Sequence, residues 1–315
     1  EISACLVGSE MCIRDSFKER LVMSFDYFRN TTKDQLMTIP LPASTGSEDI
    51  VVNFGENQNV GYDFSVAGQV IRNKNWAWTS VINGSHVKDR IKQISDKLKN
   101  TAYQLEEDNP LKLRFREGGS QYDIYAVRSA GIDPATGQEI FINKNGEYTF
   151  KYDAEDEVVV GNTQPKLQGT WLNTLRYKGW SLNFVFSYTF GGDTYNKTLW
   201  EKVEDIDPRY NVDERAFTDR WKNPGDLSRY LAIKERRSTT PHNSERFVER
   251  LNELWLSSAT LTYEFQPKFL KRLGFKRLAV GVGVSDIVRF STVKYERGTS
   301  YPYCRTINLT FRPTF

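Results

Sequence analysis

Few side chains in this sequence have the types and spacing that chemistry requires. The histidines and cysteines lack partners at the spacing of a metal site. They are His86, His242, Cys5, Cys12 and Cys304. The sequence has no glycine-rich phosphate loop, nucleophile elbow or zincin motif, and no carboxylate pair stands out by its spacing. We therefore predict no catalytic residue, no metal and no cofactor, and we expect that the protein is not an enzyme.

One acidic segment is a candidate cation site. Residues Glu204–Glu214 (EDIDPRYNVDE) offer oxygen ligands that suit calcium. The segment lacks the central glycine and the twelve-position register of an EF-hand. A solvated acidic loop is the favoured interpretation, with calcium binding as the alternative.

Composition narrows the class of protein. The 43 basic and 40 acidic residues give a net charge of +3, which is too balanced to predict nucleic-acid binding. Only 39% of residues are hydrophobic, while 13% are aromatic. No apolar run reaches the roughly eighteen residues of a transmembrane helix. The mean hydropathy of -0.57 still allows a membrane β-barrel, because its strands expose only alternate side chains to lipid.

The first sixteen residues differ from the rest of the chain. Ile2–Ser16 (ISACLVGSEMCIRDS) resembles a translated sequencing-adapter read-through and does not share the pattern that follows. We predict that residues 1–16 are non-native and exclude them from fold reasoning. The protein proper is then residues 17–315.

Period-two alternation is the main structural signal after residue 20. In Ser181–Phe190 the even positions are apolar and most odd positions are polar, which places them on opposite faces of a strand. Similar strands are expected at Leu21–Phe28, Val60–Ile71, Trp76–Val87, Lys166–Arg176, Ser258–Phe265, Lys276–Ser285 and Arg305–Phe315. Their lengths approach the ~9–11 residues with which a tilted strand crosses a bilayer.

The connections between these strands alternate between short and long. Tight turns at Arg72–Asn75 and Tyr177–Gly179 are followed by long links at Lys88–Gln164 and Gly191–Leu254. Short periplasmic turns and long extracellular loops give this alternation in an antiparallel barrel. We predict an all-β fold: the C-terminal portion of a transmembrane β-barrel, with about eight to ten strands and long extracellular loops.

Two segments of the long links have structure of their own. Ile140–Phe150 contains the turn dipeptide Asn145-Gly146 and predicts a hairpin. It fits either two further barrel strands or a hairpin within a loop. Val87–Thr101 has helical character and predicts a short loop helix.

The last predicted strand carries a candidate assembly signal. Apolar residues alternate with polar ones, and phenylalanine is the last residue. The positions concerned are Ile307, Leu309, Phe311 and Phe315. We interpret them as the signal that the barrel-assembly machinery recognises, and the alternative is an ordinary amphipathic strand.

Seven segments resemble the C-terminal region of SusC-like TonB-dependent transporters (the RagA/SusC family), in the order of that family. They are Ser24–Leu36, Asn59–Val70, Gly131–Phe141, Gly161–Asn196, Arg220–Asp226, Ser244–Phe265 and Thr306–Phe315. The RW-x-x-PGD segment is the most specific of them. Its family-signature residues are Arg220, Trp221, Pro224, Gly225 and Asp226. Val284–Gly298 follows the family pattern only loosely, which leaves the subfamily open.

The resemblance implies a location and a function. It implies an outer-membrane protein that imports oligosaccharides or peptides, using the TonB complex and a SusD-like surface lipoprotein. It also implies that residues 17–315 are the C-terminal part of the barrel, without the plug domain. Two alternatives are a passive or structural barrel, such as a porin or adhesin, and a soluble extracellular β-rich binding protein.

The signature loop has two interpretations at this point. Trp221 could pack on cargo or on a partner lipoprotein. The favoured alternative is that Pro224-Gly225 sets a turn and Trp221 fixes it in place.

Overall fold

The computed structural model describes most of the 315-residue chain. The described residues are 9–16, 20–40, 49–95, 116–207, 209, 211–233, 243–265, 275–294 and 305–314. Within them, no helix is long and apolar enough to cross a membrane.

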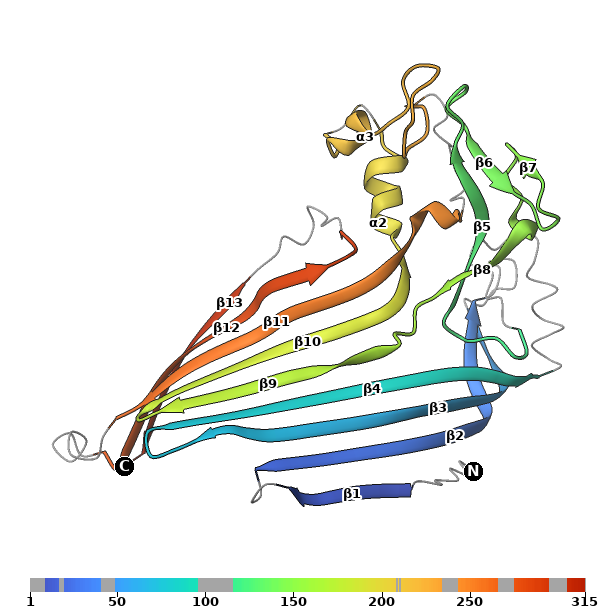
Figure 1. The fold of residues 1–315 in the computed structure, drawn as a ribbon. Coiled ribbons are helices and arrows are strands. Elements are labelled where there is room, and N and C mark those ends of the chain that lie inside the picture. Colours follow the sequence, from blue (N-terminus) through green and yellow to red (C-terminus); the bar gives the residue numbers. More distant parts are fainter. Residues whose placement is uncertain are drawn as a thin grey trace.

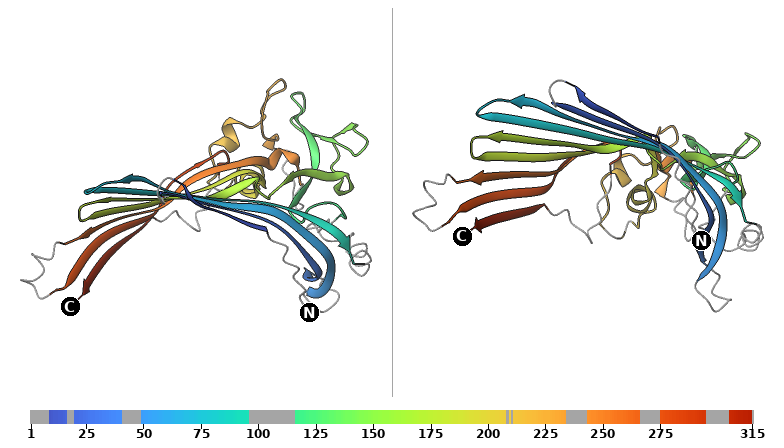
Figure 2. Two further views of the ribbon diagram at one scale, coloured as in Figure 1. Left: turned by 60° about the horizontal axis from the view of Figure 1, so that its bottom comes forward. Right: turned by 90° about the horizontal axis from the view of Figure 1, so that it is seen from below.

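Nine strands form one antiparallel sheet in the order β1-β2-β3-β4-β9-β10-β11-β12-β13. The strands are β1 (Ser9–Ser16), β2 (Leu21–Pro40), β3 (Asp49–Arg72), β4 (Trp76–Ile94), β9 (Leu167–Tyr177), β10 (Trp180–Tyr195), β11 (Val248–Glu264), β12 (Arg277–Ser291) and β13 (Thr306–Thr314). The sheet is a meander that twists and curves, as Figures 1 and 2 show. Among the described residues it does not close, because β1 and β13 form its two edges.

All eight strands expected after residue 20 are confirmed. Several are longer than their alternation indicated: β2 continues to Pro40, β10 continues to Tyr195, and β11 begins at Val248. The ninth strand, β1, pairs with β2. It lies within residues 1–16, whose non-native origin stays a prediction.

The helix predicted from Val87 onward is wrong for its described part, which continues β4 to Ile94. Here β4 bulges: Ile91 pairs with Asn57 and Gln93 pairs with Glu56, which leaves Lys92 as an extra residue. A bulge puts residues three apart on the same face, and both Ile91 and Ile94 are buried. Their spacing therefore imitates a helical period. Residues 96–101 of the prediction lie outside the described residues.

One face of the sheet is apolar in register across its strands. Leu182 pairs with Leu175 on one side and Leu261 on the other, and Val282 pairs with Leu261 and Leu309. The next row, on the opposite face, is polar: it contains Asn183, Thr174, Thr260, Gly283 and Asn308. The register thus produces one apolar and one polar surface.

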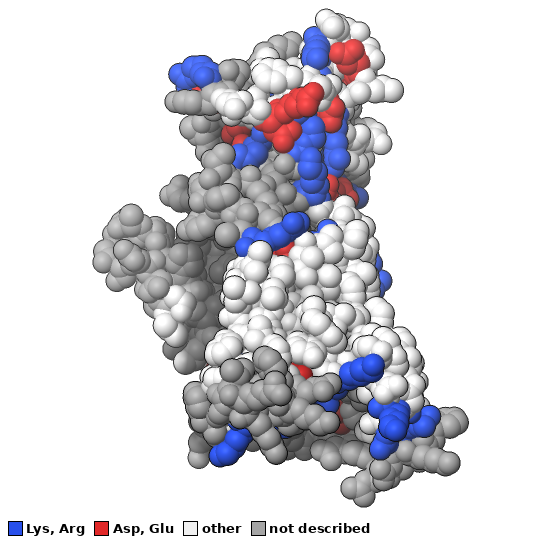
Figure 3. All heavy atoms as spheres, turned by 90° about the vertical axis from the view of Figure 1, so that its left-hand side faces the viewer, with Lys and Arg blue, Asp and Glu red and all other residues white. Residues whose placement is uncertain are grey.

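The apolar face is exposed in the part of the chain that the structure describes. Leu261 is 42% exposed, Val280 is 38% exposed and Phe311 is 64% exposed. Figure 3 shows a broad zone without charged side chains on one side of the molecule, with charged residues gathered above and below it. Such a band fits contact with lipid better than contact with a protein layer.

Aromatic side chains mark both ends of the apolar face. At the end with the short turns, Trp76 lies 4.3 Å from Tyr177 and Trp180 lies 4.7 Å from Tyr263, measured between ring centroids. At the other end, Tyr62 contacts Phe25 and His86. From Trp180 to Phe190, β10 spans about 33 Å along the strand, or about 23 Å across the bilayer at a 45° tilt. This height matches the ~25 Å apolar band of outer-membrane barrels.

Two glycines let aromatic side chains pack closely against the backbone on the apolar face. Gly84 and Gly169 are paired on β4 and β9. A Cβ atom on Gly84 would lie 2.3 Å from the Phe64 ring, and one on Gly169 would lie 2.7 Å from the Tyr188 hydroxyl. That hydroxyl donates to the carbonyl of Asn83 at 2.8 Å. Glycine is therefore needed at both positions for this close approach.

The long link after β4 contains a second, four-stranded sheet in the order β7-β6-β5-β8. Its strands are β5 (Asp123–Ile132), β6 (Glu139–Ile142), β7 (Tyr148–Thr149) and β8 (Glu157–Asn162), with a 3-10 turn η2 (Ala154–Asp156) before β8. The hairpin within Ile140–Phe150 belongs to this sheet. Of the two interpretations left open by the sequence, the loop hairpin is therefore the one observed.

The link between β10 and β11 contains short helices. They are α2 (Lys197–Leu199), the π-helical turn η3 (Trp200–Glu204), α3 (Arg215–Thr218) and the 3-10 turn η5 (Glu245–Phe247). Figure 1 shows them beside the four-stranded sheet, at the end of the large sheet opposite the short turns.

The two faces of β11 provide a direct test of the membrane orientation. We expect Ala259→Arg, at a position that pairs with Phe184 near the middle of the apolar band, to destabilise the membrane-inserted complete barrel by about 2–4 kcal/mol, because a cation on the lipid side near the bilayer midplane is desolvated. The neighbouring Thr260→Arg, on the opposite face, serves as the matched control. The measurement is the fraction of heat-modifiable, folded barrel in the outer-membrane fraction, and equal loss in both variants would contradict the assigned orientation.

Candidate functional site in the long loops

Two long loops, residues 116–166 and 196–247, pack together, and we call their described parts the loop unit. The amide of Val127 donates to the carbonyl of Asn243 at 2.8 Å, and the amide of Ala232 donates to the carbonyl of Gly137 at 3.0 Å. Val127 also forms an isolated bridge with Ser244. Backbone hydrogen bonds therefore join segments that lie far apart in the sequence.

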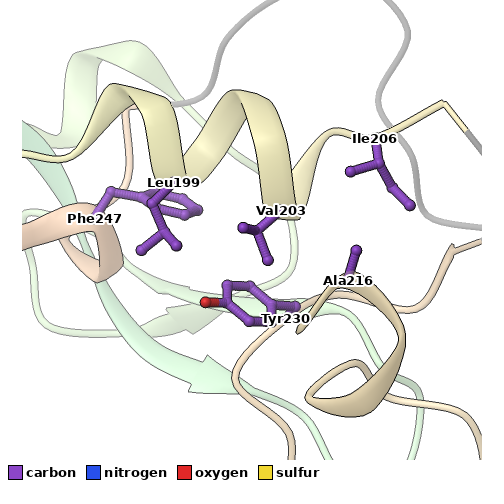
Figure 4. Close-up of a cluster of buried hydrophobic side chains, with 6 residues drawn as sticks. All are labelled: Leu199, Val203, Ile206, Ala216, Tyr230 and Phe247. Carbon is purple, nitrogen blue, oxygen red and sulfur yellow. The ribbon is translucent and has the colours of Figure 1, made fainter. Parts of the chain in front are cut away.

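A small hydrophobic core lies inside the second loop (Figure 4). Its buried members are Leu199, Val203, Ile206, Ala216, Tyr230 and Phe247. The Asn196 side chain accepts from the amide of Leu199 at 2.9 Å and so begins the helical segment that carries Leu199 and Val203. The loop thus has a packed interior, which holds its backbone in one arrangement.

Arg220, from the signature segment, is buried and bonded to backbone carbonyls. Its guanidinium donates to the carbonyls of Ala216 (2.8 Å), Leu231 (3.0 Å), Val203 (2.6 Å) and Glu204 (2.6 Å). Carbonyls at the ends of short helical turns lack intrahelical partners, and a buried cation satisfies several of them at once. Arg220 therefore connects the end of η3, α3 and the strand-like segment around Leu231.

Trp221 packs between the two loops. It is 8% exposed, and its indole N–H donates to the carbonyl of Pro134 at 2.8 Å. A Cβ atom on Gly137, which has a φ of 75°, would lie 2.6 Å from the indole ring. In this arrangement Trp221 is a packing residue of the loop unit, and any contact with cargo or a partner stays a prediction.

The rest of the signature segment is a tight turn. Gly225 has a φ of 100°, and its amide donates to the carbonyl of Pro134 at 2.8 Å. The Asp226 carboxylate accepts from the amides of Asn223 (2.8 Å) and Lys222 (3.1 Å), and these bonds lower the pKa of Asp226. Positive φ favours glycine, so the Pro224-Gly225 dipeptide suits this turn. The five signature residues lie together in one place.

A buried ion cluster joins the two loops. Arg246 Nη2 lies 2.9 Å from Glu139 Oε2 and 3.0 Å from Glu204 Oε1. Glu139 also accepts from the Ser244 hydroxyl. Glu139 is on β6 of the first loop, whereas Glu204 and Arg246 belong to the second. One guanidinium therefore holds carboxylates from both loops.

Burial and charge act in opposite directions on this cluster. Burial by itself raises the pKa of Glu139, but the Arg246 charge and the hydrogen bonds from Arg246 and Ser244 outweigh it and hold that pKa below its ordinary value. Burial lowers the pKa of Arg246, and Glu204 and Glu139 more than reverse that effect, so it is raised. Glu139 and Arg246 are therefore both charged at neutral pH.

The acidic segment Glu204–Glu214 mostly pairs with cations. Asp207 lies 2.5 Å from Arg209, and Asp213 lies 2.9 Å from Arg215. The hydrogen bond from Arg215 lowers the pKa of Asp213 to about 2. No group of three or more residues suited to a metal ion is found in the described part of the chain.

The candidate assembly signal lies on the edge strand β13. Ile307, Leu309 and Phe311 are 68%, 82% and 64% exposed, all on the apolar face. Phe315 lies outside the described residues. The role of the four residues in assembly stays a prediction.

Sequence reasoning missed the Glu139–Arg246–Glu204 cluster. Arg246 is 107 residues from Glu139 and 42 from Glu204, so no local spacing connects them. The sequence offered one weak signal for two of the three charges, because Arg246 is followed by the buried Phe247 and Glu204 follows the buried Val203.

Known proteins similar to this chain are outer-membrane receptors. The chain is 26% identical over 317 residues to TonB-dependent receptor P39 of Formosa agariphila, covering 87% of the chain and 30% of the receptor. It is also 26% identical over 336 residues to TonB-dependent receptor P26 of the same organism, covering 95% of the chain and 33% of that receptor. The chain is related to TonB-dependent receptors. It spans about 30% of the length of these relatives.

Solved structures agree on the fold. The RagAB peptide transporter matches with a TM-score of 0.72 and 20% identity, covering 88% of this chain and 30% of that one. The RagAB peptide importer in its 'open-open' state matches with a TM-score of 0.69 and 20% identity, covering 89% of this chain and 30% of that one. No family model matches the chain. The antiparallel sheet is therefore part of an outer-membrane β-barrel fold, as predicted.

The comparisons also test two further expectations from the sequence. The relatives are outer-membrane proteins, which confirms the predicted localisation. They are also receptors and transporters, which confirms the expectation that the chain is not an enzyme.

Removing the shared cation should separate the two loops. We expect Arg246→Met to destabilise the loop unit by about 3–5 kcal/mol, because it leaves two buried carboxylates without their counter-charge. Arg209→Gln is the control: its ion pair is on the surface, with the Arg209 side chain 79% exposed, and contributes about 0–1 kcal/mol. Hydrogen exchange of peptides from residues 123–162 and 196–233 measures the effect. Unchanged protection in Arg246→Met would contradict a role in joining the loops.

Acid should have a related effect through Glu139. Because its folded pKa lies below the ordinary 4.5, Glu139 stabilises the fold above that pH and loses the contribution as pH falls through the folded value. We expect exchange in the loop unit, corrected for the intrinsic effect of pH, to rise as the pH falls below 4.5. Glu139→Gln should weaken this pH dependence of exchange. If the variant and the native protein show the same pH dependence, other carboxylates cause it.

Proposed function

We propose that the complete protein is an outer-membrane importer that depends on TonB and carries oligosaccharides or peptides. The observation that carries this proposal is the similarity to TonB-dependent receptors over 87% or more of the chain. The fold shared with the RagAB peptide transporter supports it, with a TM-score of 0.72. That transporter is named for peptides, so peptides stand as one of the two cargo classes.

The loop unit is the proposed external part of the transport path. It lies at the end of the large sheet opposite the short turns (Figure 1). Its buried contacts hold two loops in one arrangement before any ligand binds. A preorganised surface loses less conformational entropy on binding than two flexible loops.

Exposed apolar side chains of the loop unit are candidates for binding contacts. Leu227 is 91% exposed, Tyr148 is 72% exposed and Phe150 is 51% exposed. Aromatic rings can stack on sugar rings or pack against peptide side chains, and exposed leucine suits a protein partner. We propose that these residues meet cargo or a SusD-like surface lipoprotein.

Two further partners belong to the same proposal. The TonB complex would energise uptake through parts of the receptor beyond this chain. The barrel-assembly machinery would recognise the strand that carries Ile307, Leu309, Phe311 and Phe315.

Uptake in cells separates energised from passive transport. We expect a strain that carries the complete gene to accumulate labelled oligosaccharide or oligopeptide in a saturable manner, with uptake reduced at least about tenfold when tonB is deleted, since passive diffusion alone remains. The comparison strain lacks the gene. Equal uptake with and without TonB would support the passive barrel instead, and uptake equal to that of the comparison strain would refute transport of that cargo.

A further inference from the structure

Three cations lie just beyond the aromatic residues at the long-loop end of the apolar face. Arg29 on β2, Lys88 on β4 and Arg90 on β4 are all exposed. In strand register they follow Tyr27 and His86, which mark the edge of the apolar band.

The pairing of strands places these cations on the lipid side. Tyr27, Tyr62 and His86 form one row across β2, β3 and β4, and two residues further along the next row is Arg29, Val60 and Lys88. Two residues beyond that, Gln58 pairs with Arg90. The register is uninterrupted over these rows, so the side chains share a face. The stacked contact between Phe25 and Tyr62, at 5.9 Å, confirms that this is the apolar face.

Their height corresponds to lipid headgroups. Two and four residues along a strand are about 7 and 13 Å, which become about 5 and 9 Å across the bilayer at a 45° tilt. Aromatic side chains lie at the membrane interface, and the headgroup layer outside the hydrocarbon is about 5–7 Å thick on each side. Long lysine and arginine side chains reach into this layer from positions beside it.

These cations also lack carboxylate partners among the described residues. The loop unit pairs its cations: Arg246 with Glu139, and Arg229 with Glu249. Arg29 contacts an uncharged group, because Gln58, with its amide oxygen turned toward it, accepts from Arg29 Nε at 2.9 Å. Glu56 is one position further out on the same strand face and forms no ion pair with a described residue. Three positive charges on neighbouring strands therefore remain uncompensated by described acidic side chains.

We propose that Arg29, Lys88 and Arg90 bind the phosphate groups of an anionic lipid in the membrane leaflet on the long-loop side. A guanidinium donates two parallel hydrogen bonds to phosphate, and an ammonium adds a point charge beside it. The acyl chains of the same lipid would lie on the apolar face below Tyr62 and His86. Headgroup and chains would thus be held by one continuous surface, whatever cargo the receptor carries.

Lipid binding by the purified complete receptor tests the proposal. The probes are lipid A with its phosphates, the same lipid with its phosphates removed, and inorganic phosphate, each measured by native mass spectrometry from detergent. The test variant combines Arg29→Gln, Lys88→Gln and Arg90→Gln. The control variant removes three exposed cations of the loop unit, through Lys144→Gln, Lys151→Gln and Lys222→Gln.

We expect the native receptor and the control variant to bind phosphorylated lipid A, and the test variant to bind it at least about tenfold more weakly, with salt reducing the difference. Equal binding of the dephosphorylated lipid would overturn the proposal, since the phosphate would then contribute nothing. If the test variant binds phosphorylated lipid A as tightly as the native receptor does, these three residues do not form the binding site. Tight binding of inorganic phosphate by itself would assign the site to a free anion instead. Heat-modifiable migration of all variants reports whether each barrel is folded.

Discussion

Backbone hydrogen bonding between neighbouring strands is the constraint on which this structure depends. Hydrocarbon offers no water to satisfy an amide or a carbonyl, so each membrane-crossing strand must pair along both of its edges. The nine-stranded antiparallel ladder meets this demand for its seven inner strands. Within the described residues β1 and β13 each have one open edge, so both need further strands in a membrane.

The same ladder determines the chemistry of each surface. Pairing in register brings Leu182, Leu261 and Val282 to one side and Asn183, Thr260 and Gly283 to the other. Polar groups on the apolar side are then satisfied locally, as when Trp171 Nε1 donates to Ser80 Oγ at 2.8 Å. The aromatic rows and the cations beyond them follow from this arrangement, because each lies at a fixed number of residues from the centre of a strand.

The loop unit uses a different means of stabilisation. Its hydrophobic cluster is small, and buried charges such as Arg220 and Arg246 supply much of the order. A buried ion pair adds little net stability over a hydrophobic alternative, because desolvation offsets its attraction. It is nevertheless specific in geometry, since a guanidinium accepts only partners placed around its plane. The cluster of Glu139, Arg246 and Glu204 therefore determines how the two loops fit together more than how strongly they fold.

The sequence by itself determined the strands, their two faces and the membrane location. Period-two alternation can be recognised without knowing which strands pair, because successive side chains of a strand always point to opposite sides. Only the tertiary structure decided that Ile140–Phe150 is a loop hairpin, that a bulge at Lys92 continues β4 where a helix was predicted, and that Arg246 joins Glu139 to Glu204. Those outcomes depend on which segments contact each other in the folded protein. The local spacing of residues does not predict contacts between residues about a hundred positions apart.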